Sequence, residues 1–232
     1  MDDQDWRTLL KLGGAAVLVA SLILSATGAQ AIDVAEAQKV LRTSFPEAVE
    51  TELALSAVPP GLRDGAAVYV FGASGYKLAR NGSNGFTCLL NRDAFFYGSI
   101  NFKPTCWDAD GKASYVPVML RVGEMLAAGK SAEDIKADVD AGFRVGRFHR
   151  PTRTGVAYML AGDVNLDTQT GTVTKQAFTG HYMIYAPGVT NADIGVTPNM
   201  SAEKMMPVIF DRGAGGSNLA YLIAVPEHMH AP

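Results

Sequence analysis

The spacing of apolar residues divides the chain into a helical beginning and a later region of short strands. Between residues 32 and 58, apolar side chains recur at intervals of three and four, which is typical of amphipathic helices. Pro46 is expected to break this helical stretch, and Pro59-Pro60-Gly61 is expected to end it. The pattern therefore predicts a helical lead-in over residues 32–60.

Short runs rich in β-branched and aromatic residues follow, separated by Gly, Pro, Asn and Asp, as is typical of strands and turns. Asn-Gly steps at 81–82 and 84–85 favour a hairpin between the runs 76–80 and 86–93. The Asp110-Gly111 step is expected to form a further turn. The other predicted strands cover 66–72, 155–160, 171–178, 181–186, 207–210 and 220–225, and Cys106 is expected on or near an extended segment.

A pair of helices is predicted between these groups of strands. The first covers 115–130, with Pro117 in its first turn and Gly129 at its end. Ser131 is expected to cap the second, which ends near Phe143. We therefore predict an α+β fold: one mostly antiparallel sheet with the helical pair, at about 115–143, packed on one face after the helical lead-in. Residues 61–232 are expected to form a single domain, whose strand order the pattern does not give.

The N-terminal segment has the pattern of a secretory signal peptide. Arg7 and Lys11 precede an apolar run of about 12 residues, and Ala29 and Ala31 occupy the small-residue positions of a cleavage site. Residues 1–31 are therefore predicted to be removed on export, leaving a soluble periplasmic or secreted protein. The alternative is an uncleaved membrane anchor, although the apolar run is shorter than the roughly 20 residues of a spanning helix.

The charge of the chain argues against one class of partner. The formal net charge is −3, and removal of residues 1–31, with their three acidic and two basic residues, leaves about −2. Binding to nucleic acids requires a dominant basic surface, so we exclude it. Contact with a membrane is expected only if the signal segment stays uncleaved.

Export also suggests how the two cysteines are used. Cysteines in an exported chain pair more often than they stay free, so Cys88 and Cys106, 18 positions apart, are predicted to form a disulfide. The alternative is free, reactive or metal-bound thiols. No histidine precedes His149, so a Cys/His zinc site would need distant ligands.

The densest cluster of basic residues lies directly after the second predicted helix. Guanidinium groups bind carboxylates and phosphates in a bidentate manner, so this cluster is a candidate binding site for an anion or an acidic partner. The structural alternative is a basic helix end followed by a solvated loop. The cluster consists of Arg144, Arg147, His149, Arg150 and Arg153.

Histidines offer weaker candidates for catalysis and for metal binding. His181 begins a predicted strand that also contains Tyr185, and it is a candidate general base or, alternatively, a structural residue at the sheet edge. In a hydrolase, His181 or His149 would be the base, and Asp108 or Asp211 would orient it. His228 and His230 are weak candidate metal ligands near the chain end, which is expected to be frayed.

The segment 163–171 spaces Asp163, Asn165 and Asp167 as calcium-binding loops do. Thr168 and Thr174 stand where such loops need glycine and glutamate, so we expect a polar hairpin turn instead. No metal or other cofactor is predicted.

Several stretches also resemble a family of uncharacterised exported bacterial proteins. The stretches are ARNGSNGFTCLLNRD, PTCWDADG, GVAYML and HYMIYAPG. In the family, a Gly-Phe-Thr-Cys segment is followed by Cys-(aromatic)-Asp and later by Tyr-Ala-Pro. The resemblance covers roughly residues 60–226 and implies export and a single domain, but it transfers no activity and no catalytic residue.

No complete catalytic constellation is visible in the sequence. We therefore expect a non-catalytic exported domain that binds a small molecule or an envelope protein. Its binding groups would be the arginines of 144–153 and polar residues near Asn84, Arg92, His181 and Tyr185. The alternatives are the hydrolase described above and an inhibitor or scaffold for a partner protein.

Overall fold

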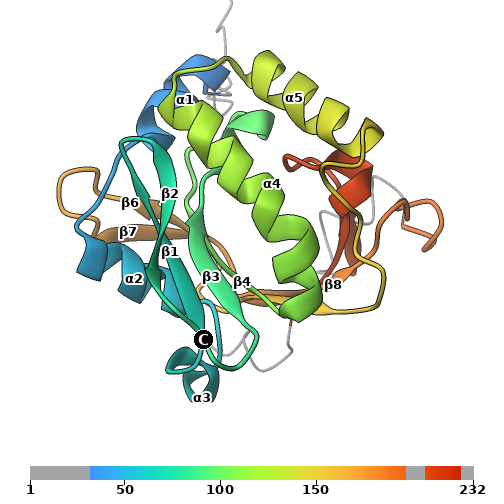
Figure 1. Cartoon of the computed structure of the whole chain (residues 1–232), viewed down its shortest axis with the longest axis horizontal. Helices are drawn as coiled ribbons and strands as arrows, with labels where there is room; N and C mark the ends of the chain where they lie inside the picture. The colour runs from blue at the N-terminus through green and yellow to red at the C-terminus, as the bar shows by residue number, and fades with distance from the viewer. Residues whose placement is uncertain (1–31, 197–206, 226–232) are drawn as a thin grey trace, which may run out of the picture. The chain divides into compact units, whose positions relative to one another are not determined.

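The chain is built around a twisted sheet whose strands are mostly antiparallel (Figure 1). A computed structural model describes residues 32–196 and 207–225. Within these ranges, an eight-stranded sheet has the order β2-β1-β3-β4-β5-β8-β10-β9, and β6 and β7 form a separate two-stranded sheet. The strands are β1 (Ala67–Gly72), β2 (Gly75–Arg80), β3 (Thr87–Asn91), β4 (Lys103–Trp107), β5 (Val156–Met159), β6 (Asp163–Leu166), β7 (Val173–Phe178), β8 (His181–Tyr185), β9 (Val208–Phe210) and β10 (Tyr221–Ala224).

The Asn-Gly steps do not form the predicted hairpin. β2 pairs with β1 and lies at the sheet edge, whereas β3 pairs with β1 on its other side and runs parallel to it. The segment 81–86 therefore carries the chain from the edge strand past β1. Gly85 has the positive φ of 84° expected of an Asn-Gly turn, but Gly82 is needed for close approach, because a Cβ there would lie 2.3 Å from the backbone nitrogen of Ala67.

The predicted disulfide is confirmed, and it lies in a different hairpin. β3 and β4 are antiparallel neighbours, and Cys88 and Cys106 face each other directly in their register. Their sulfur atoms are bonded, their Cα atoms are 4.0 Å apart, and both residues are fully buried. The bridge therefore joins two central strands inside the core.

The predicted helical pair is confirmed as α4 (Ala109–Ala127) and α5 (Ala132–Arg144). α4 packs across β2, β3 and β4, and α5 packs against α4 (Figure 1). α4 begins earlier than predicted, because the carboxylate of Asp108 accepts hydrogen bonds from the backbone N–H groups of Asp110 and Gly111. The expected turn at Asp110-Gly111 is thus the first turn of the helix, and Pro117 lies in the helix interior.

The predicted signals between these two helices are confirmed. Gly129 follows the end of α4 with a φ of 71°, and the next residue, Lys130, donates its N–H to the carbonyl of Met125, as in a Schellman motif. The hydroxyl of Ser131 accepts a hydrogen bond from the N–H of Asp134, which caps α5.

The helical lead-in forms α1 (Val34–Leu41), α2 (Glu47–Leu55) and the short α3 (Pro60–Arg63). Pro46 separates α1 from α2, as predicted, and forms the N-cap of α2. Alternation along the strands assigns α2 to the sheet face opposite α4. Cys88 and Cys106 pack in one core cluster with Ala54 of α2, whereas Leu89 and Trp107 belong to the core cluster that includes α4.

The described residues all fall within a single compact unit that begins at Ala31. Short 3₁₀ helices, η1 (Asp93–Tyr97) and η2 (Gly216–Leu219), lie beside the sheet's second half. None of the helices in the described ranges is long and apolar enough to cross a membrane. The predicted signal peptide lies outside the described residues.

Candidate functional site

A cavity of about 310 Å³ lies on the α4 side of the sheet, over β4, β5, β8, β9 and β10. Strand alternation brings its lining together, because every second residue of a strand faces the same side. β4 contributes Lys103, Thr105 and Trp107, and β8 contributes His181 and Met183. The cavity is closed further by α4, by η1 and by the β6–β7 hairpin, which contributes Asp163 and Phe178.

One wall of the cavity is aromatic and fixed in position by hydrogen bonds. The rings of Tyr115 and Tyr221 stack with centroids 4.6 Å apart and planes 18° apart. The indole N–H of Trp107 donates to the hydroxyl of Tyr221 at 2.6 Å, and the hydroxyl of Tyr115 donates to the carbonyl of Ala220 at 3.2 Å. This wall is rigid and apolar, and its polar atoms already have partners.

The aromatic wall is extended by flexible apolar side chains. Methionine adapts its shape to irregular spaces and makes favourable contacts with aromatic rings. Three methionines, Met119, Met159 and Met183, line the cavity together with Leu219 and Ile223. The aromatic and methionine side chains together suit a flat organic molecule.

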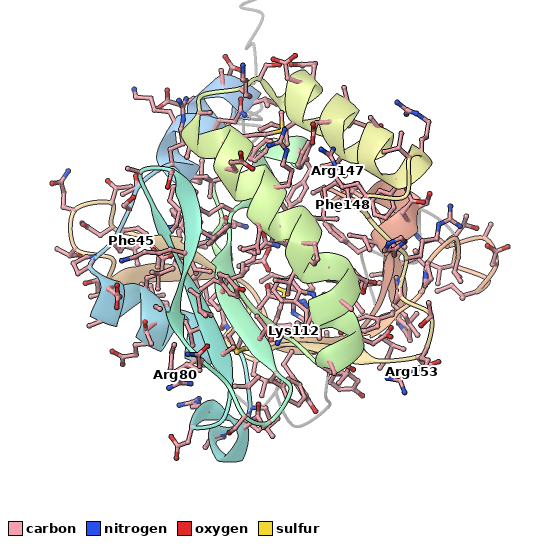
Figure 2. The ribbon with its side chains drawn as sticks, in the orientation of Figure 1. Phe45, Arg80, Lys112, Arg147, Phe148 and Arg153 are labelled. Carbon is pink, nitrogen blue, oxygen red and sulfur yellow. A yellow bond between two sulfur atoms is a disulfide. The ribbon has the colours of Figure 1, made fainter. Side chains whose placement is uncertain are left out.

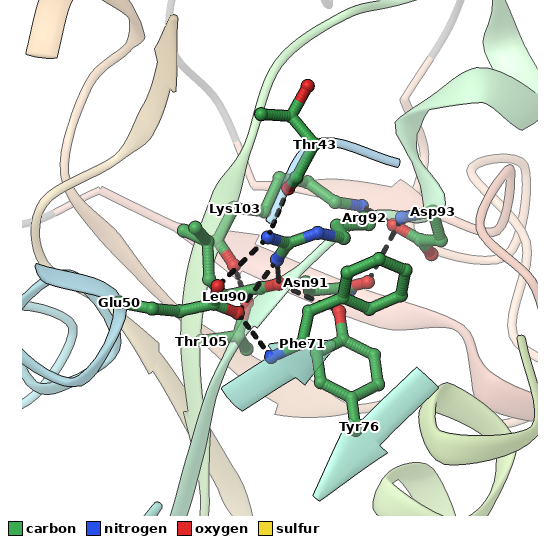
Figure 3. A network of polar contacts seen from close by, with 10 residues as sticks. All are labelled: Thr43, Glu50, Phe71, Tyr76, Leu90, Asn91, Arg92, Asp93, Lys103 and Thr105. Atoms are coloured by element: carbon green, nitrogen blue, oxygen red, sulfur yellow. Dashed lines mark hydrogen bonds and ion pairs between the residues drawn. The ribbon is translucent and has the colours of Figure 1, made fainter. Parts of the chain in front are cut away.

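The opposite wall carries buried charges. The ammonium of Lys103 forms an ion pair with Asp93, and the two side chains are only 8% and 3% exposed. Burial lowers the pKa of Lys103, but the charges of Asp93 and its neighbours outweigh this effect and raise the pKa overall, so the lysine is an ammonium. Figure 3 shows this pair beside a second buried pair, formed by Glu50 and Arg92.

The Lys103–Asp93 pair is held by further contacts. The second oxygen of Asp93 accepts the N–H of Ala214 at 3.2 Å. The ammonium lies 5.4 Å from the ring centre of Tyr97 and 5.6 Å from that of Phe210, a cation–π geometry. Burial raises the pKa of Tyr97 to about 12, so its hydroxyl stays neutral near Lys103.

Asp163 and His181 form the reactive part of this wall. The Nδ1–H of His181 donates to the carbonyl of Thr179 at 2.8 Å, because a carbonyl oxygen can only accept, and Nε2 is therefore the basic nitrogen of the neutral ring. Burial lowers the pKa of His181 and raises the pKa of Asp163, although the two groups attract each other when both are charged. Both shifts favour the uncharged forms.

An arginine lies at the exposed end of the cavity. Arg212 is exposed, and its guanidinium lies 5.8 Å from the ring centre of Tyr97 and 5.7 Å from that of Phe210. These are the same rings that face Lys103. Cations thus approach this aromatic pair from both the interior and the surface.

The structure separates the arginines of 144–153. Arg147 donates to the carboxylate of Asp138 at 2.7 Å, and hydrogen bonds from Arg121, together with this one, lower the pKa of Asp138. Arg153 is far more exposed and lies 3.9 Å from the carboxylate of Asp110. Figure 2 shows Arg147 beside Phe148 and Arg153 well away from both.

The rest of the cluster lines an open surface depression at the end of α5. Arg144, His149 and Arg150 contribute to it, and Arg150 donates to the side chain of Asn218 at 2.8 Å. This depression is separate from the cavity over the sheet, and the two share no lining residue within the described ranges. An anion bound there would contact these three residues rather than Arg147.

Most of the other sequence candidates have structural contacts. The hydroxyl of Tyr185 donates to Asp108 or to the carbonyl of Val156, each at 2.9 Å, and Tyr185 does not line the cavity. Arg92 is buried in its ion pair with Glu50. The amide of Asn84 donates to the carbonyl of Leu62. None of these side chains is free to contact a ligand in the cavity.

Asp108 and Asp211 do not have the role of orienting His181 that the sequence suggested. Both oxygens of Asp108 accept hydrogen bonds at the start of α4 and from Val156, and Asp211 is exposed outside the cavity. The carboxylate that interacts with His181 is Asp163. His228 and His230 lie outside the described residues.

The calcium-like spacing belongs to a hairpin, as expected. β6 and β7 are antiparallel, and the carboxylate of Asp167 accepts the N–H groups of Gln169 and Thr170 in the turn between them. Within 32–196 and 207–225, no group of three or more His, Cys, Asp or Glu side chains is arranged to hold a metal ion.

No protein-family model, curated protein or solved structure matches the chain. Its function is therefore inferred from the cavity and its lining.

Proposed function

We propose that the protein binds a small organic molecule in the cavity. The observation that carries this proposal is a partly open cavity with a hydrogen-bonded aromatic wall facing a wall of ionisable groups. The volume of about 310 Å³ lies at the lower end of the range for small-molecule sites, which is about 300 to 1,000 Å³. An aromatic wall provides affinity, and a few polar groups orient the ligand.

Burial of the polar wall supports the proposal. A buried ion pair such as Lys103–Asp93 seldom contributes net stability, because desolvation of the charges offsets their attraction. Asp163 adds a half-buried carboxyl group that forms no ion pair within 4 Å in the described part of the chain. Polar groups of this kind inside an apolar cavity suit recognition of a ligand better than stabilisation of the fold.

Native mass spectrometry of the protein purified without chelator tests the proposal. We expect a bound small molecule on the wild type, or binding of aromatic fragments added at millimolar concentration. Met119→Trp, which places a larger ring in the cavity, should abolish binding, whereas Leu78→Trp, at an exposed position on β2, should not. A folded wild type that retains no compound and binds no fragment would contradict the proposal.

A hydrolase is a second candidate, favoured by His181. Its Nδ1 is occupied by the carbonyl of Thr179, so Nε2 is available as a general base in the cavity, with Asp163 nearby. Among the described residues no serine or cysteine lines the cavity, so water would be the nucleophile that His181 activates. This candidate predicts that His181→Ala abolishes hydrolysis of an ester or amide panel without lowering the melting temperature. If His181→Ala mainly unfolds the protein, the residue is structural.

We further propose that the protein acts outside the cytoplasm. The Cys88–Cys106 disulfide supports this, because disulfides persist in oxidising compartments and are rare in the cytosol. The pattern of residues 1–31 points in the same direction. Cell fractionation tests the proposal: the protein should be found in the periplasm or the medium, with a mass that lacks residues 1–31. Full-length protein in the cytosol with free thiols would contradict it.

A further inference from the structure

Asp93, Lys103, Asp163 and His181 form the polar wall of the cavity. Their hydrogen-bonding atoms that have no partner indicate what kind of group the ligand carries. The ammonium of Lys103 is occupied by Asp93 and by the faces of Tyr97 and Phe210. Asp93 is also occupied by the N–H of Ala214. This half of the wall is therefore satisfied without a ligand.

The other half of the wall retains unused capacity. Nε2 of His181 is an acceptor in the neutral ring, because Nδ1 carries the proton that bonds to Thr179. Asp163 and Asn101 both line the cavity, and the Asn101 side chain acts to lower the pKa of the Asp163 carboxyl group. No ion pair within 4 Å occupies Asp163 in the described part of the chain, so its carboxyl group can bond to a ligand. A ligand that reaches this corner has to provide a hydrogen for His181.

The charges in the cavity disfavour an ionised ligand of either sign. Lys103 and Asp93 already neutralise each other, and burial favours the uncharged form of Asp163. An ionised ligand would therefore lose its water on entering the cavity without gaining a free counter-charge inside it. Arg212 lies at the exposed end, where water screens its charge. An uncharged polar group avoids the desolvation penalty.

A hydroxyl meets these requirements because it donates and accepts at once. It can donate to Nε2 of His181 and, where the carboxyl group of Asp163 holds a proton, accept from it. Tyr115, Tyr221 and Trp107 all line the cavity and offer apolar ring surface to an aromatic body. The methionines on the remaining surface tolerate variation in the outline of that body.

We propose that the cavity selects an uncharged aromatic molecule that carries a hydroxyl group, with the hydroxyl bound between Asp163 and His181 and the ring against Tyr115 and Tyr221. This inference rests on the proposed function and specifies its ligand class. It assigns Asp163 and His181 to ligand recognition and Lys103–Asp93 to exclusion of charged compounds.

Isothermal titration of the full-length protein with matched two-ring probes tests the inference. The probes are 2-naphthol, 2-methoxynaphthalene, 2-naphthoate and 2-naphthylmethylammonium, which share one aromatic body and differ in their polar group. We expect 2-naphthol to bind at least about tenfold more tightly than 2-methoxynaphthalene, because the ether has no hydrogen to donate. Both ionised probes should bind more weakly than 2-naphthol.

Variants of Asp163 and His181 test whether these two residues cause the preference for the hydroxyl group. His181→Phe and Asp163→Val should bring the affinity of 2-naphthol to within about threefold of that of its methyl ether. Asp211→Asn, an exposed change outside the cavity, should leave the difference intact. Circular dichroism identifies any variant that fails to fold, and the comparison of probes on the wild type then decides alone.

The outcomes separate the two proposals. If no probe binds, the proposed function fails together with this inference. If 2-naphthol and 2-methoxynaphthalene bind equally, or if an ionised probe binds most tightly, the cavity is a binding site but the hydroxyl selectivity is wrong. Selective binding that survives both His181→Phe and Asp163→Val would also overturn it, because the hydroxyl would then bind elsewhere.

Discussion

Glu50 and Arg92 form a bidentate ion pair inside the core, with Nη1 to Oε1 and Nη2 to Oε2 distances of 3.0 Å (Figure 3). Their side chains are 0% and 1% exposed, and the guanidinium lies over the ring of Phe71 at 4.5 Å from its centre. Glu50 also accepts the backbone N–H of Phe71 at 2.8 Å. The pair thus fastens α2 and the segment after β3 to the end of β1.

Removal of the acidic partner should strongly destabilise the protein. Burial raises the pKa of Glu50, although the charge of Arg92 acts to lower it. The guanidinium of Arg92 stays charged with or without a carboxylate beside it. Glu50→Gln therefore leaves a buried, uncompensated cation and should lower the free energy of unfolding by about 3 to 5 kcal/mol. Urea denaturation followed by circular dichroism measures the change.

The exposed pair Lys77–Glu47 provides the matched control. Its side chains are 65% and 55% exposed, and their nitrogen–oxygen distance of 2.8 Å is as short as that of the buried pair. Glu47→Gln should cost less than about 1 kcal/mol, because water screens the pair. Equal costs for Glu47→Gln and Glu50→Gln would show that burial does not determine the strength of the Glu50–Arg92 interaction.

Loss of the disulfide should destabilise the two central strands. Cys88 and Cys106 close a loop with a sequence separation of 18 and lie opposite each other in β3 and β4. In the chain-entropy treatment, such a loop is worth about 3 kcal/mol. The double variant Cys88→Ala/Cys106→Ala should lose about this much free energy of unfolding. Thiol labelling of denatured, unreduced wild type should detect no cysteine, and two labelled thiols would refute the bridge.

Local sequence signals predicted the helical pair and most strands, because their causes lie within a few residues. Ser131 caps α5 through the N–H of Asp134, and Gly129 ends α4 with a positive φ. The start of α4 differs from the prediction, because an Asp-Gly step is typical of a turn, whereas here the carboxylate of Asp108 caps a helix that begins at this step. The predicted export to an oxidising compartment was enough to predict the disulfide.

The polar wall could not be predicted, because the order of the strands creates it. Asp93, Lys103 and Asp163 are distant in sequence and come from η1, β4 and β6. The parallel pairing of β1 with β3 was missed for the same reason, since local turn chemistry favoured a hairpin. One signal was present: Lys103 directly precedes the extended segment that contains Cys106. It is the first residue of β4, whose five residues are all buried, and a buried lysine requires a partner.

Tyr185 is expected to support the fold rather than the ligand, in contrast to its assignment from the sequence. Its hydroxyl lies 2.9 Å from Asp108, and Gly111 leaves the space for it, because a Cβ there would lie 2.1 Å from the hydroxyl oxygen. Tyr185→Phe should lower the free energy of unfolding by about 1 kcal/mol and leave 2-naphthol affinity unchanged. Tyr182→Phe, at a half-buried neighbouring position, is the control. Loss of binding at unchanged stability would return Tyr185 to the ligand site.

The burial of His181 predicts how stability depends on pH. Burial lowers its pKa below the ordinary value of about 6.5, so on acidification the unfolded chain takes up a proton at this residue before the folded chain does. The stability gained by keeping the ring neutral is therefore fully present above about pH 6.5 and is lost as the pH falls through the folded-state pKa. Wild-type protein should lose more stability between pH 7.5 and 5.5 than His181→Gln, as measured by urea midpoints.

The groups around His181 sharpen this prediction. Burial raises the pKa of Asp163, so this residue by itself would make the folded protein more stable on acidification. The charge of Asp163 also favours the protonated ring of His181, whereas the charge of Lys103 disfavours it. Asp163→Asn should therefore steepen the loss of stability on acidification, since His181 loses its attracting carboxylate. His149→Gln, at an exposed position outside the cavity, is the control for the substitution itself. If His181→Gln shows the same acid dependence as the wild type, folding does not lower the pKa of His181, and the argument that burial keeps its ring neutral in the cavity fails.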